Sequence, residues 1–435
     1  MIRYIKLQNY RSFTDLTIDF MSKNGFPLKF VVLYGENGSG KSNLINMFET
    51  LYDTTQTMSI RNMLMHLLEE NQEPDHITDL ASLKQYMDIT RIIRANKTIG
   101  SIDNMIMEIG FQLEGKNGIY YIEFDNDQII KEQLEFTIEK NKGIYYQIDK
   151  KRIKINNKIF GDYREEYISS LRKFWGKHSA LAILFNAKDE FSDSYFSDTV
   201  NPYLLSVLKY IQSICVYMAD NNSMRGIINT MDTLSPEMYT DGEISVSDEC
   251  KIDHTEQMLN KFFQSTYRDI KKVFYKKSYT NTTLSYELYF TRFISGKERS
   301  VSFVNESCGT RNLIYLLPYC IAVSNNHVVA IDEIDNGIHD ILLLNLVKAL
   351  YQNINGQLLI TTHNTMLLNE YEFKDSFFFI EIDENGKRRI NTPSDFGYRI
   401  QPESNVVVNY LHDRFKGLPW RDMDVDFHYI AENNQ

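Results

Sequence analysis

Residues 35–42 have the spacing of a phosphate-binding loop. They match the pattern G-x-x-x-x-G-K-[ST], with an apolar run before them and an amphipathic run after them. Glycines let backbone N–H groups wrap around phosphates because no Cβ stands in the way. In such a loop Lys41 reaches the β- and γ-phosphates, and the Ser42 hydroxyl binds Mg²⁺. The predicted residues around ATP and Mg²⁺ are Gly35, Glu36, Asn37, Gly38, Ser39, Gly40, Lys41 and Ser42.

A second apolar run, 328–331, ends in two acids. Asp332 is predicted to complete the Mg²⁺ shell, and Glu333 to orient and deprotonate the attacking water as a general base. Strands also end in acids for solvation alone, and without Lys41 that interpretation would be the better one. The phosphate-binding loop therefore supports a catalytic role for Glu333.

Two further motifs carry polar groups at the ends of predicted elements. The run 357–360 leads into Thr-Thr-His, which places His363 in the crevice where α/β sheets bind ligands, so that it could contact the γ-phosphate. Ser307, Gly309 and Thr310 open an apolar helix whose N-terminus could hold an anion. The alternatives are a solvent-facing histidine and an ordinary helix cap.

The elements that must position these residues follow from hydrophobic patterning. Residues 28–34 are almost continuously apolar, as in a strand buried on both faces, and a helix is predicted from 43 onward. Alternating segments between 105 and 160 predict an antiparallel sheet, with a hairpin turn at residues 117 and 118. The rest of the expected order is helices over 165–215 with a cap at Asn201-Pro202, a mobile polar loop over 219–256, a helix near 255–275, a strand over 284–293, and α/β alternation from 305.

Composition limits the possible classes of protein. The chain has 435 residues, of which 43% are hydrophobic and 13% aromatic, enough for a packed core rather than disorder. Its net charge of −11 excludes a globally basic nucleic-acid coat. The four cysteines show no metal-binding or disulfide spacing, and no signal peptide or membrane span is evident, which predicts a cytoplasmic protein.

Two local basic clusters remain compatible with nucleic-acid binding. One lies on or beside a predicted strand with two tyrosines, and the other along the predicted helix, interleaved with aromatic residues. The alternative for both is a solvated or protein-binding face. The clusters are Lys150, Lys151, Arg152, Lys154 and Lys158 with Tyr145 and Tyr146, and Arg268, Lys271, Lys272, Lys276 and Lys277 with Phe274, Tyr275 and Tyr279.

In their order along the chain, the motifs resemble the ABC-type ATPase head of the SMC, RecF and OLD lineage. The resemblance is closest to the defence-associated AAA ATPases, which include ATPase subunits of abortive-infection, Septu and PARIS systems. It rests on residues 2–13 as first strand, 305–313 as signature motif, 332–339 as Walker B and D-loop, His363 as H-loop, and 410–415 as closing helix. No Q-loop glutamine can be assigned.

The resemblance implies an α/β fold: an ABC-type P-loop ATPase head with an antiparallel β subdomain and a helical insertion lobe. The expected division is 1–165 and 301–435 for the two parts of the head, with 166–300 as the insertion. In such heads the signature helix of one subunit caps the nucleotide held by the other. Ser307, Gly309 and Thr310 would therefore contact ATP in trans, and ATP would join a homodimer or higher oligomer.

The function implied is an ATP-driven switch in an anti-phage system, with a separate nuclease or toxin as effector and DNA or a phage protein as possible trigger. Residues 364–435 are too few for a nuclease domain, and Asp422, Asp424 and Asp426 are interpreted as an exposed tail rather than a metal site. The alternatives are a RecF- or SMC-like DNA-repair clamp and a scaffold that binds ATP without hydrolysing it. The acidic charge and the absence of a long coiled coil favour the switch.

Overall fold

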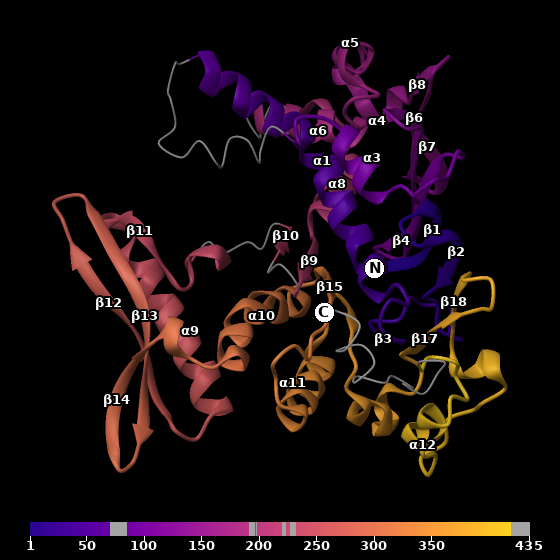
Figure 1. Ribbon diagram of the computed structural model, residues 1–435. Coiled ribbons are helices and arrows are strands. Elements are labelled where there is room, and N and C mark those ends of the chain that lie inside the picture. The colour runs from indigo at the N-terminus through magenta and orange to yellow at the C-terminus, as the bar shows by residue number, and fades with distance from the viewer. Residues whose placement is uncertain (70–84, 191–195, 197, 220–222, 227–231, 419–435) are drawn as a thin grey trace, which may run out of the picture.

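The computed structural model describes residues 1–69, 85–190, 196, 198–219, 223–226 and 232–418. Within these ranges the chain forms two seven-stranded sheets and one four-stranded sheet. The four-stranded sheet projects to one side of the molecule, and the other two sheets lie together with most of the helices (Figure 1). In the described ranges, no helix is long and apolar enough to cross a membrane.

The central sheet is mostly parallel and has the order β10-β9-β15-β16-β3-β17-β18. Its five inner strands pair in parallel, and the two edge strands pair antiparallel. The strands are β3 (Phe30–Tyr34), β9 (Ile214–Met218), β10 (Ser223–Arg225), β15 (Val328–Ile331), β16 (Gln357–Thr361), β17 (Phe377–Ile382) and β18 (Arg388–Asn391). Strands β3, β9, β15 and β16 are buried throughout, which explains their continuous apolar sequences.

The two faces of β3 enter different hydrophobic clusters. Val31 and Leu33 join the cluster beneath the antiparallel sheet, whereas Val32 and Tyr34 join the one beneath helices α10 and α11. Helix α1 (Lys41–Glu69) packs on the first face, and α10 (Cys308–Ser324) and α11 (Asp340–Asn353) pack on the second. The strand that leads into the phosphate loop is therefore held from both sides.

The second sheet is antiparallel, as the alternating sequence over 105–160 predicted. Its order is β2-β1-β4-β5-β6-β7-β8, so the N-terminal strand pair extends the same sheet. The strands are β1 (Ile2–Tyr10), β2 (Phe13–Asp19), β4 (Met105–Leu113), β5 (Lys116–Phe124), β6 (Ile129–Ile138), β7 (Asn141–Asp149) and β8 (Ile153–Ile155).

The hairpin turn expected at residues 117 and 118 lies three residues earlier. Glu114 and Gly115 both have positive φ, at 51° and 74°, as a two-residue type I′ turn requires. Gly118 instead pairs with Phe111 inside the ladder, and a Cβ there would lie 2.2 Å from the Phe111 ring. The glycine is needed for this close approach rather than for the turn.

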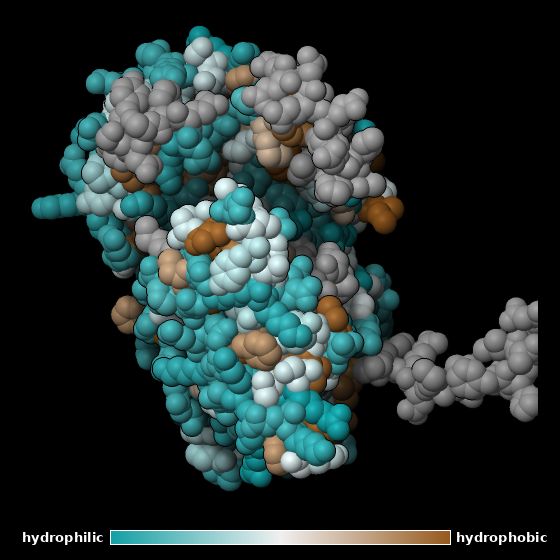
Figure 2. All heavy atoms as spheres, turned by 90° about the vertical axis from the view of Figure 1, so that its left-hand side faces the viewer, coloured by the Kyte–Doolittle hydropathy of each residue, from teal (hydrophilic) through white to brown (hydrophobic). Residues whose placement is uncertain are grey.

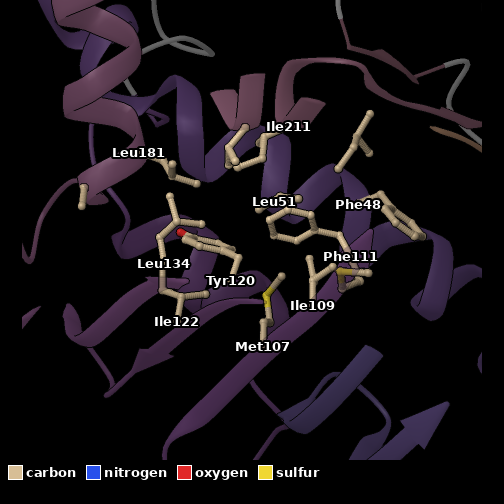
Figure 3. Packing of buried hydrophobic residues seen from close by; sticks show 14 of the residues in the cluster. Phe48, Leu51, Met107, Ile109, Phe111, Tyr120, Ile122, Leu134, Leu181 and Ile211 are labelled. Atoms are coloured by element: carbon tan, nitrogen blue, oxygen red, sulfur yellow. The ribbon is translucent and has the colours of Figure 1, made fainter. Parts of the chain in front are cut away.

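Residues 165–215 are mostly helical, as predicted, and the structure packs these helices against the antiparallel sheet. They are α5 (Arg164–Phe174), α6 (Ala180–Glu190) and α8 (Pro202–Gln212). Asn201 caps α8, because its Oδ1 accepts a hydrogen bond from Tyr203 N at 2.9 Å. Figure 3 shows how Phe48 and Leu51 of α1 meet Ile109 and Phe111 of β4 in the first cluster.

The third sheet and helix α9 form a projecting unit, residues 241–302, which we call the side lobe (Figure 1). It consists of β11 (Asp241–Ser245), α9 (Glu249–Thr266), β12 (Ile270–Tyr279), β13 (Thr283–Ile294) and β14 (Lys297–Ser302). Two expectations are wrong here. The polar stretch 219–256 contains β11 and the start of α9, and the helix expected near 255–275 ends at Thr266.

Residues 270–279 form a strand because their pattern changes to period two. Val273 and Tyr275 are buried, and Lys272 and Lys276 face outward. Helix α9 covers the free edge of this strand. Its Asn260 side chain accepts a hydrogen bond from Val273 N at 2.8 Å and donates one to Val273 O. An amide side chain on the helix thus replaces a neighbouring strand.

The C-terminal segment adds a hairpin and short helical turns. Residues 383–387 connect β17 to β18 as a hairpin, with Asn385-Gly386 in the turn. The predicted closing helix starts and ends earlier, at α12 (Val406–Leu411). The remaining helical elements are α3 (Thr90–Asn96), α4 (Asn157–Phe160), η1 (Gly161–Tyr163), η2 (Pro236–Met238), η3 (Val246–Asp248), η4 (Phe303–Asn305), η5 (Thr365–Asn369), η6 (Tyr371–Phe373) and η7 (Pro393–Phe396).

Candidate nucleotide-binding site

Three neighbouring strands bring the sequence motifs to one edge of the central sheet. Strand β16 lies between β3 and β15, and all three run in parallel. Thr361 is level with Leu33, and Ile360 is level with Ile331. The residues that follow these strands therefore share the carboxyl edge of the sheet, where parallel α/β sheets bind their ligands.

The phosphate-binding loop connects β3 to α1, which begins at Lys41. Gly38 and Gly40 have φ values of +81° and +109°, which residues with a Cβ atom rarely adopt. Lys41 is 5% exposed, and its Nζ donates to Gly35 O at 2.8 Å and to Glu36 O at 3.1 Å. The ammonium group is thus folded back onto carbonyls of the loop that it is predicted to leave when it binds phosphate.

The charge of Lys41 is balanced by the acids that follow β15, two strands away in the sheet. Burial lowers the pKa of the Lys41 ammonium below its ordinary value, and the carboxylates of Asp332 and Glu333 act in the opposite direction. This mutual influence places the lysine and the two acids in one electrostatic environment. An anion with bound metal would restore favourable partners to all of them.

Asp332 and Glu333 are held by Thr361 on the neighbouring strand. The Thr361 hydroxyl donates to Asp332 Oδ1 at 2.6 Å and accepts from Glu333 N at 2.7 Å. Asp332 is 2% exposed, while Glu333 has a φ of +46°, in the left-handed region that non-glycine residues seldom adopt. Such strained backbone is common at functional sites, because it turns a side chain out of the line of its strand.

His363 lies at the end of β16, next to the same group. Its backbone N–H donates to Asp335 Oδ2 at 3.0 Å, and the residue is only partly covered by its neighbours. Partial burial, and then the charge of Lys41, lower the pKa of His363 below its ordinary value. The ring is therefore neutral at pH 7 and can both donate and accept a hydrogen bond.

The residues present fit ATP and Mg²⁺. Across the described ranges, Ser39 Oγ and Asp335 Oδ1 are buried and have no hydrogen-bond partner, and both lie among the predicted binding residues or beside them. No set of three or more His, Cys, Asp or Glu residues in those ranges could hold a metal ion. Mg²⁺ commonly takes one or two protein oxygens and completes its shell with phosphates and water, which suits Ser42 and Asp332.

The predicted signature residues form a separate, exposed helix end. Ser307 caps α10, with its Oγ accepting from Thr310 N at 3.2 Å. Ser307 is exposed, whereas Thr310 is fully buried. Gly309 packs on the D-loop so closely that a Cβ would lie 2.4 Å from Gly337 O. Between residues 305–310 and 35–42, both fully described, no hydrogen bond is formed.

Sequence reasoning missed the arginine that anchors the signature loop. Arg292 of β13 binds Glu306 through Nε and Nη2, at 2.8 Å and 2.7 Å, and its Nη1 contacts Asp269. The Glu306 side chain is 2% exposed, and such a buried carboxylate needs this paired partner. An acid directly before Ser-x-Gly-Thr was a usable signal, but nothing local indicated that its partner lies in the side lobe.

Some lysines of each basic cluster form ion pairs with acids of neighbouring segments. In the first cluster, Lys150 binds Asp125 at 2.9 Å, and Tyr145 and Tyr146 are fully buried and cannot stack on bases. Figure 2, in which the side lobe with the second cluster faces the viewer, shows a mostly hydrophilic surface with scattered apolar residues on that side of the molecule. These contacts favour solvated faces over a nucleic-acid interface.

The second cluster lies on strand β12 rather than along a helix. Lys277 binds Glu249 and Asp253 of α9, at 2.8 Å and 2.7 Å, and Lys276 sits 3.6 Å from the centre of the Tyr289 ring.

Among the other sequence-based expectations, none of the four cysteines is paired. The acidic run at Asp422, Asp424 and Asp426 lies outside the described residues.

Comparison with known proteins identifies the family. Residues 30–369 match the family described as "AAA domain, putative AbiEii toxin, Type IV TA system". The chain belongs to this family. The match spans the phosphate loop, the region predicted as the signature motif, the paired acids and His363, and it confirms the resemblance to defence-associated AAA ATPases.

Solved structures similar to this AAA-domain protein include SMC heads, at low identity. An SMC head bound to the C-terminal winged-helix domain of ScpA is 14% identical, with a TM-score of 0.41 over 90% of this chain and 96% of that one. The SMC head domain from Thermotoga maritima is 12% identical, with a TM-score of 0.38 over 90% and 98%. An SMC head from Pyrococcus furiosus, bound to the C-terminal domain of ScpA, is 12% identical, with a TM-score of 0.35 over 90% and 95%. No protein with a curated description matches the sequence.

Proposed function

We propose that this AAA-domain protein binds and hydrolyses ATP with Mg²⁺ and that ATP joins two of its subunits. The observation that carries the proposal is the shared edge of β3, β16 and β15, where Lys41, His363 and the pair Asp332 and Glu333 follow adjacent strand ends. The two segments predicted as the ATPase head, 1–165 and 301–435, supply these strands. Phosphate release from ATP, measured with Mg²⁺ and with EDTA, tests the proposal, and release unaffected by EDTA would contradict it.

Binding begins at the loop and the start of α1. Backbone N–H groups of residues 35–42 and the positive end of the α1 dipole attract the phosphates. Lys41 exchanges its bonds to the Gly35 and Glu36 carbonyls for bonds to the β- and γ-phosphates. Ser42 and Asp332 would hold Mg²⁺, which when bound offsets the negative charge that builds up on the transferred phosphoryl group.

Hydrolysis depends on the residues at the ends of β15 and β16. Glu333 accepts the proton of the attacking water. Its positive φ turns the carboxylate away from the direction of the buried strand. Thr361 positions Glu333 through the bond to its backbone N–H. His363, neutral at pH 7, donates one hydrogen bond to the γ-phosphate region and keeps an acceptor for water.

A second subunit would complete the site. The exposed N-terminus of α10 carries Ser307 and Cys308 and, as an unshielded helix end, provides N–H donors and a positive dipole end for a γ-phosphate. Gly309 and the buried Thr310 shape this helix start from behind. Because these residues do not bond to the phosphate loop of their own chain, an ATP held between two chains is the arrangement that uses both motifs.

Ser307→Arg is expected to block ATP-dependent dimerisation and to leave ATP binding by the monomer intact. The bulky cation would occupy the space where the neighbour's nucleotide must approach, while residues 35–42 of the same chain are untouched. Light scattering with and without ATP measures association, and calorimetry measures affinity for the nucleotide.

Mixing the variants gives a sharper check. A dimer of Ser307→Arg and Lys41→Ala subunits should contain at most one working site, formed by the phosphate loop of the first and the signature of the second. If Ser307→Arg lost ATP affinity as severely as Lys41→Ala and its association were unchanged, Ser307 would belong to the pocket of its own subunit, and the trans arrangement would be wrong.

We infer further that the ATPase regulates a separate nuclease or toxin in an anti-phage system, and a RecF-like repair clamp is the second candidate. The family description, with its link to a toxin and a type IV toxin–antitoxin system, supports the first. Expressing the chain with and without the product of an adjacent gene, in bacteria challenged by phage, tests this role. Protection should require both genes and Lys41. Protection by this chain alone would contradict a separate effector, and restored survival of DNA-damaged repair mutants would favour the clamp.

A further inference from the structure

Arg388, the first residue of the edge strand β18, contacts the outer side of the phosphate-binding loop. Its Nε donates to Ser39 O at 3.0 Å, and its Nη2 donates to Gly38 O at 3.2 Å. Its Nη1 donates to Ser12 O at 3.3 Å and to Gly386 O at 3.1 Å. One guanidinium thus joins the loop to the β1–β2 turn and to the β17–β18 turn.

The carbonyl groups of Gly38 and Ser39 share their peptide units with the N–H groups of Ser39 and Gly40. A trans peptide unit is planar, so its N–H points opposite to its C=O. Holding Gly38 O and Ser39 O outward therefore directs the N–H groups of Ser39 and Gly40 toward the inside of the loop. Ser39 N–H bonds to Glu36 O at 3.1 Å there, which closes the turn in the absence of phosphate.

The turn that shares Arg388 also packs on the loop. A Cβ at Gly40 would lie 3.0 Å from the Phe13 ring and 3.0 Å from Ser12 Oγ. Ser12 Oγ in turn accepts a hydrogen bond from Asn43 Nδ2 of α1 at 2.7 Å. The loop is therefore braced by the N-terminal turn, and Arg388 holds that turn and the loop carbonyls together.

The positive charge of the Arg388 guanidinium is not paired with a carboxylate in the described part of the chain. All the bonds made by Arg388 go to neutral carbonyls. Arginine stays protonated at any physiological pH, and its flat fork can serve several acceptors at once. A positive charge directly behind the loop adds to the attraction for phosphate.

We propose that Arg388 is a positioning residue for ATP binding, which holds the phosphate loop in its binding conformation and contributes a positive charge behind it. This inference rests on the proposed ATP-binding function. It makes the C-terminal hairpin a part of the nucleotide site, although Arg388 lies 350 positions from Gly38.

Arg388→Ala, Arg388→Lys and the control Arg389→Ala test the proposal in the full-length protein. Arg389 is the next residue of β18, is 61% exposed and only approaches Asp383, at 3.8 Å. Calorimetry with Mg²⁺ and ATP gives Kd, and phosphate release gives KM and kcat. Arg388→Ala should raise Kd and KM by about 10- to 100-fold, as expected for lost charged hydrogen bonds, and kcat at saturating ATP should stay nearly constant.

The lysine variant and added guanidinium separate positioning from charge and from stability. Lysine keeps the charge but lacks the fork, so its Kd should lie between those of wild type and Arg388→Ala. Millimolar guanidinium should partly restore the affinity of Arg388→Ala and leave Arg389→Ala unchanged. Full restoration by lysine, or an ATP affinity of Arg388→Ala equal to that of wild type, would overturn the proposal.

Failure of the proposed function gives a different result. If the wild-type protein neither binds nor hydrolyses ATP, the ATPase proposal is wrong before any variant is compared. If Arg388→Ala does not fold, the Arg388→Lys variant decides. A folded lysine variant with wild-type Kd would refute the role of the fork, and one with weakened ATP binding and an unchanged melting temperature without nucleotide would support it.

Discussion

Lys41→Ala should abolish ATP binding by a protein that still folds. The lysine is the residue of the loop that carries a full positive charge to the β- and γ-phosphates. Two charged hydrogen bonds, each contributing about 1.5–3 kcal/mol, correspond to a Kd raised by about 10²- to 10⁴-fold. Without nucleotide, the hydrogen bonds of the Lys41 side chain go to two loop carbonyls and none joins one secondary-structure element to another, so the variant should still fold.

Calorimetric titration with Mg²⁺ and ATP measures the first effect, and thermal unfolding without nucleotide measures the second. Lys209→Ala is a suitable control, because this lysine is exposed on α8, far along the chain from the phosphate loop. Equal ATP affinities for wild type, Lys209→Ala and Lys41→Ala would show that residues 35–42 do not bind the nucleotide as assigned.

Glu333→Gln should keep ATP bound but slow turnover by about 10²- to 10⁴-fold, the range for a lost general base. Glutamine has nearly the same size, and the bond from the backbone N–H of residue 333 to Thr361 Oγ1 is unaffected. Because ATP would persist between the subunits, the variant should also accumulate as a dimer or higher oligomer.

Single-turnover phosphate release and light scattering under saturating ATP measure these two effects. Glu403→Gln, at an exposed position before α12, controls for the change in charge. A variant that hydrolyses ATP at the wild-type rate would exclude Glu333 as the base. A variant that hydrolyses ATP slowly but stays strictly monomeric would support Glu333 as the general base. It would contradict the proposal that ATP joins two subunits.

Local sequence patterns predicted the elements that carry the candidate site residues. They failed for strands whose burial or pairing depends on segments distant in the sequence. The apolar run of β3 and the glycines after it are local signals, and so are the strands that end at Asp332 and His363. Strand β9 was not predicted, because Ile214–Met218 directly follows an apolar helix and differs from it only by its place in the sheet. Strand β12 was taken as helix because its closely spaced lysines and aromatics were interpreted as a continuation of the helix before it, and its pairing with β13 comes only from the tertiary structure.

The order of the strands in the central sheet could not be predicted from the sequence. Nothing in the runs 30–34, 328–331 and 357–361 indicates that the last of them lies between the other two. That order is decided by which hydrophobic faces can be buried together, with Val31 and Leu33 against one cluster and Val32 and Tyr34 against the other. It is nevertheless what allows Thr361 to bond both Asp332 and Glu333.

The sequence by itself determined the phosphate loop, the paired acids and the helix cap at Ser307, because each depends on the backbone conformation and hydrogen bonds of a few successive residues. The tertiary structure alone decided the partners of Arg292 and Arg388. The Arg388 guanidinium meets a loop about 350 positions earlier, and the Arg292 guanidinium reaches from the side lobe into the signature loop. Such contacts form only when separate sheets and hairpins pack together. A buried carboxylate or a backbone carbonyl needs a hydrogen-bond donor, and the tertiary structure decides which residue supplies it.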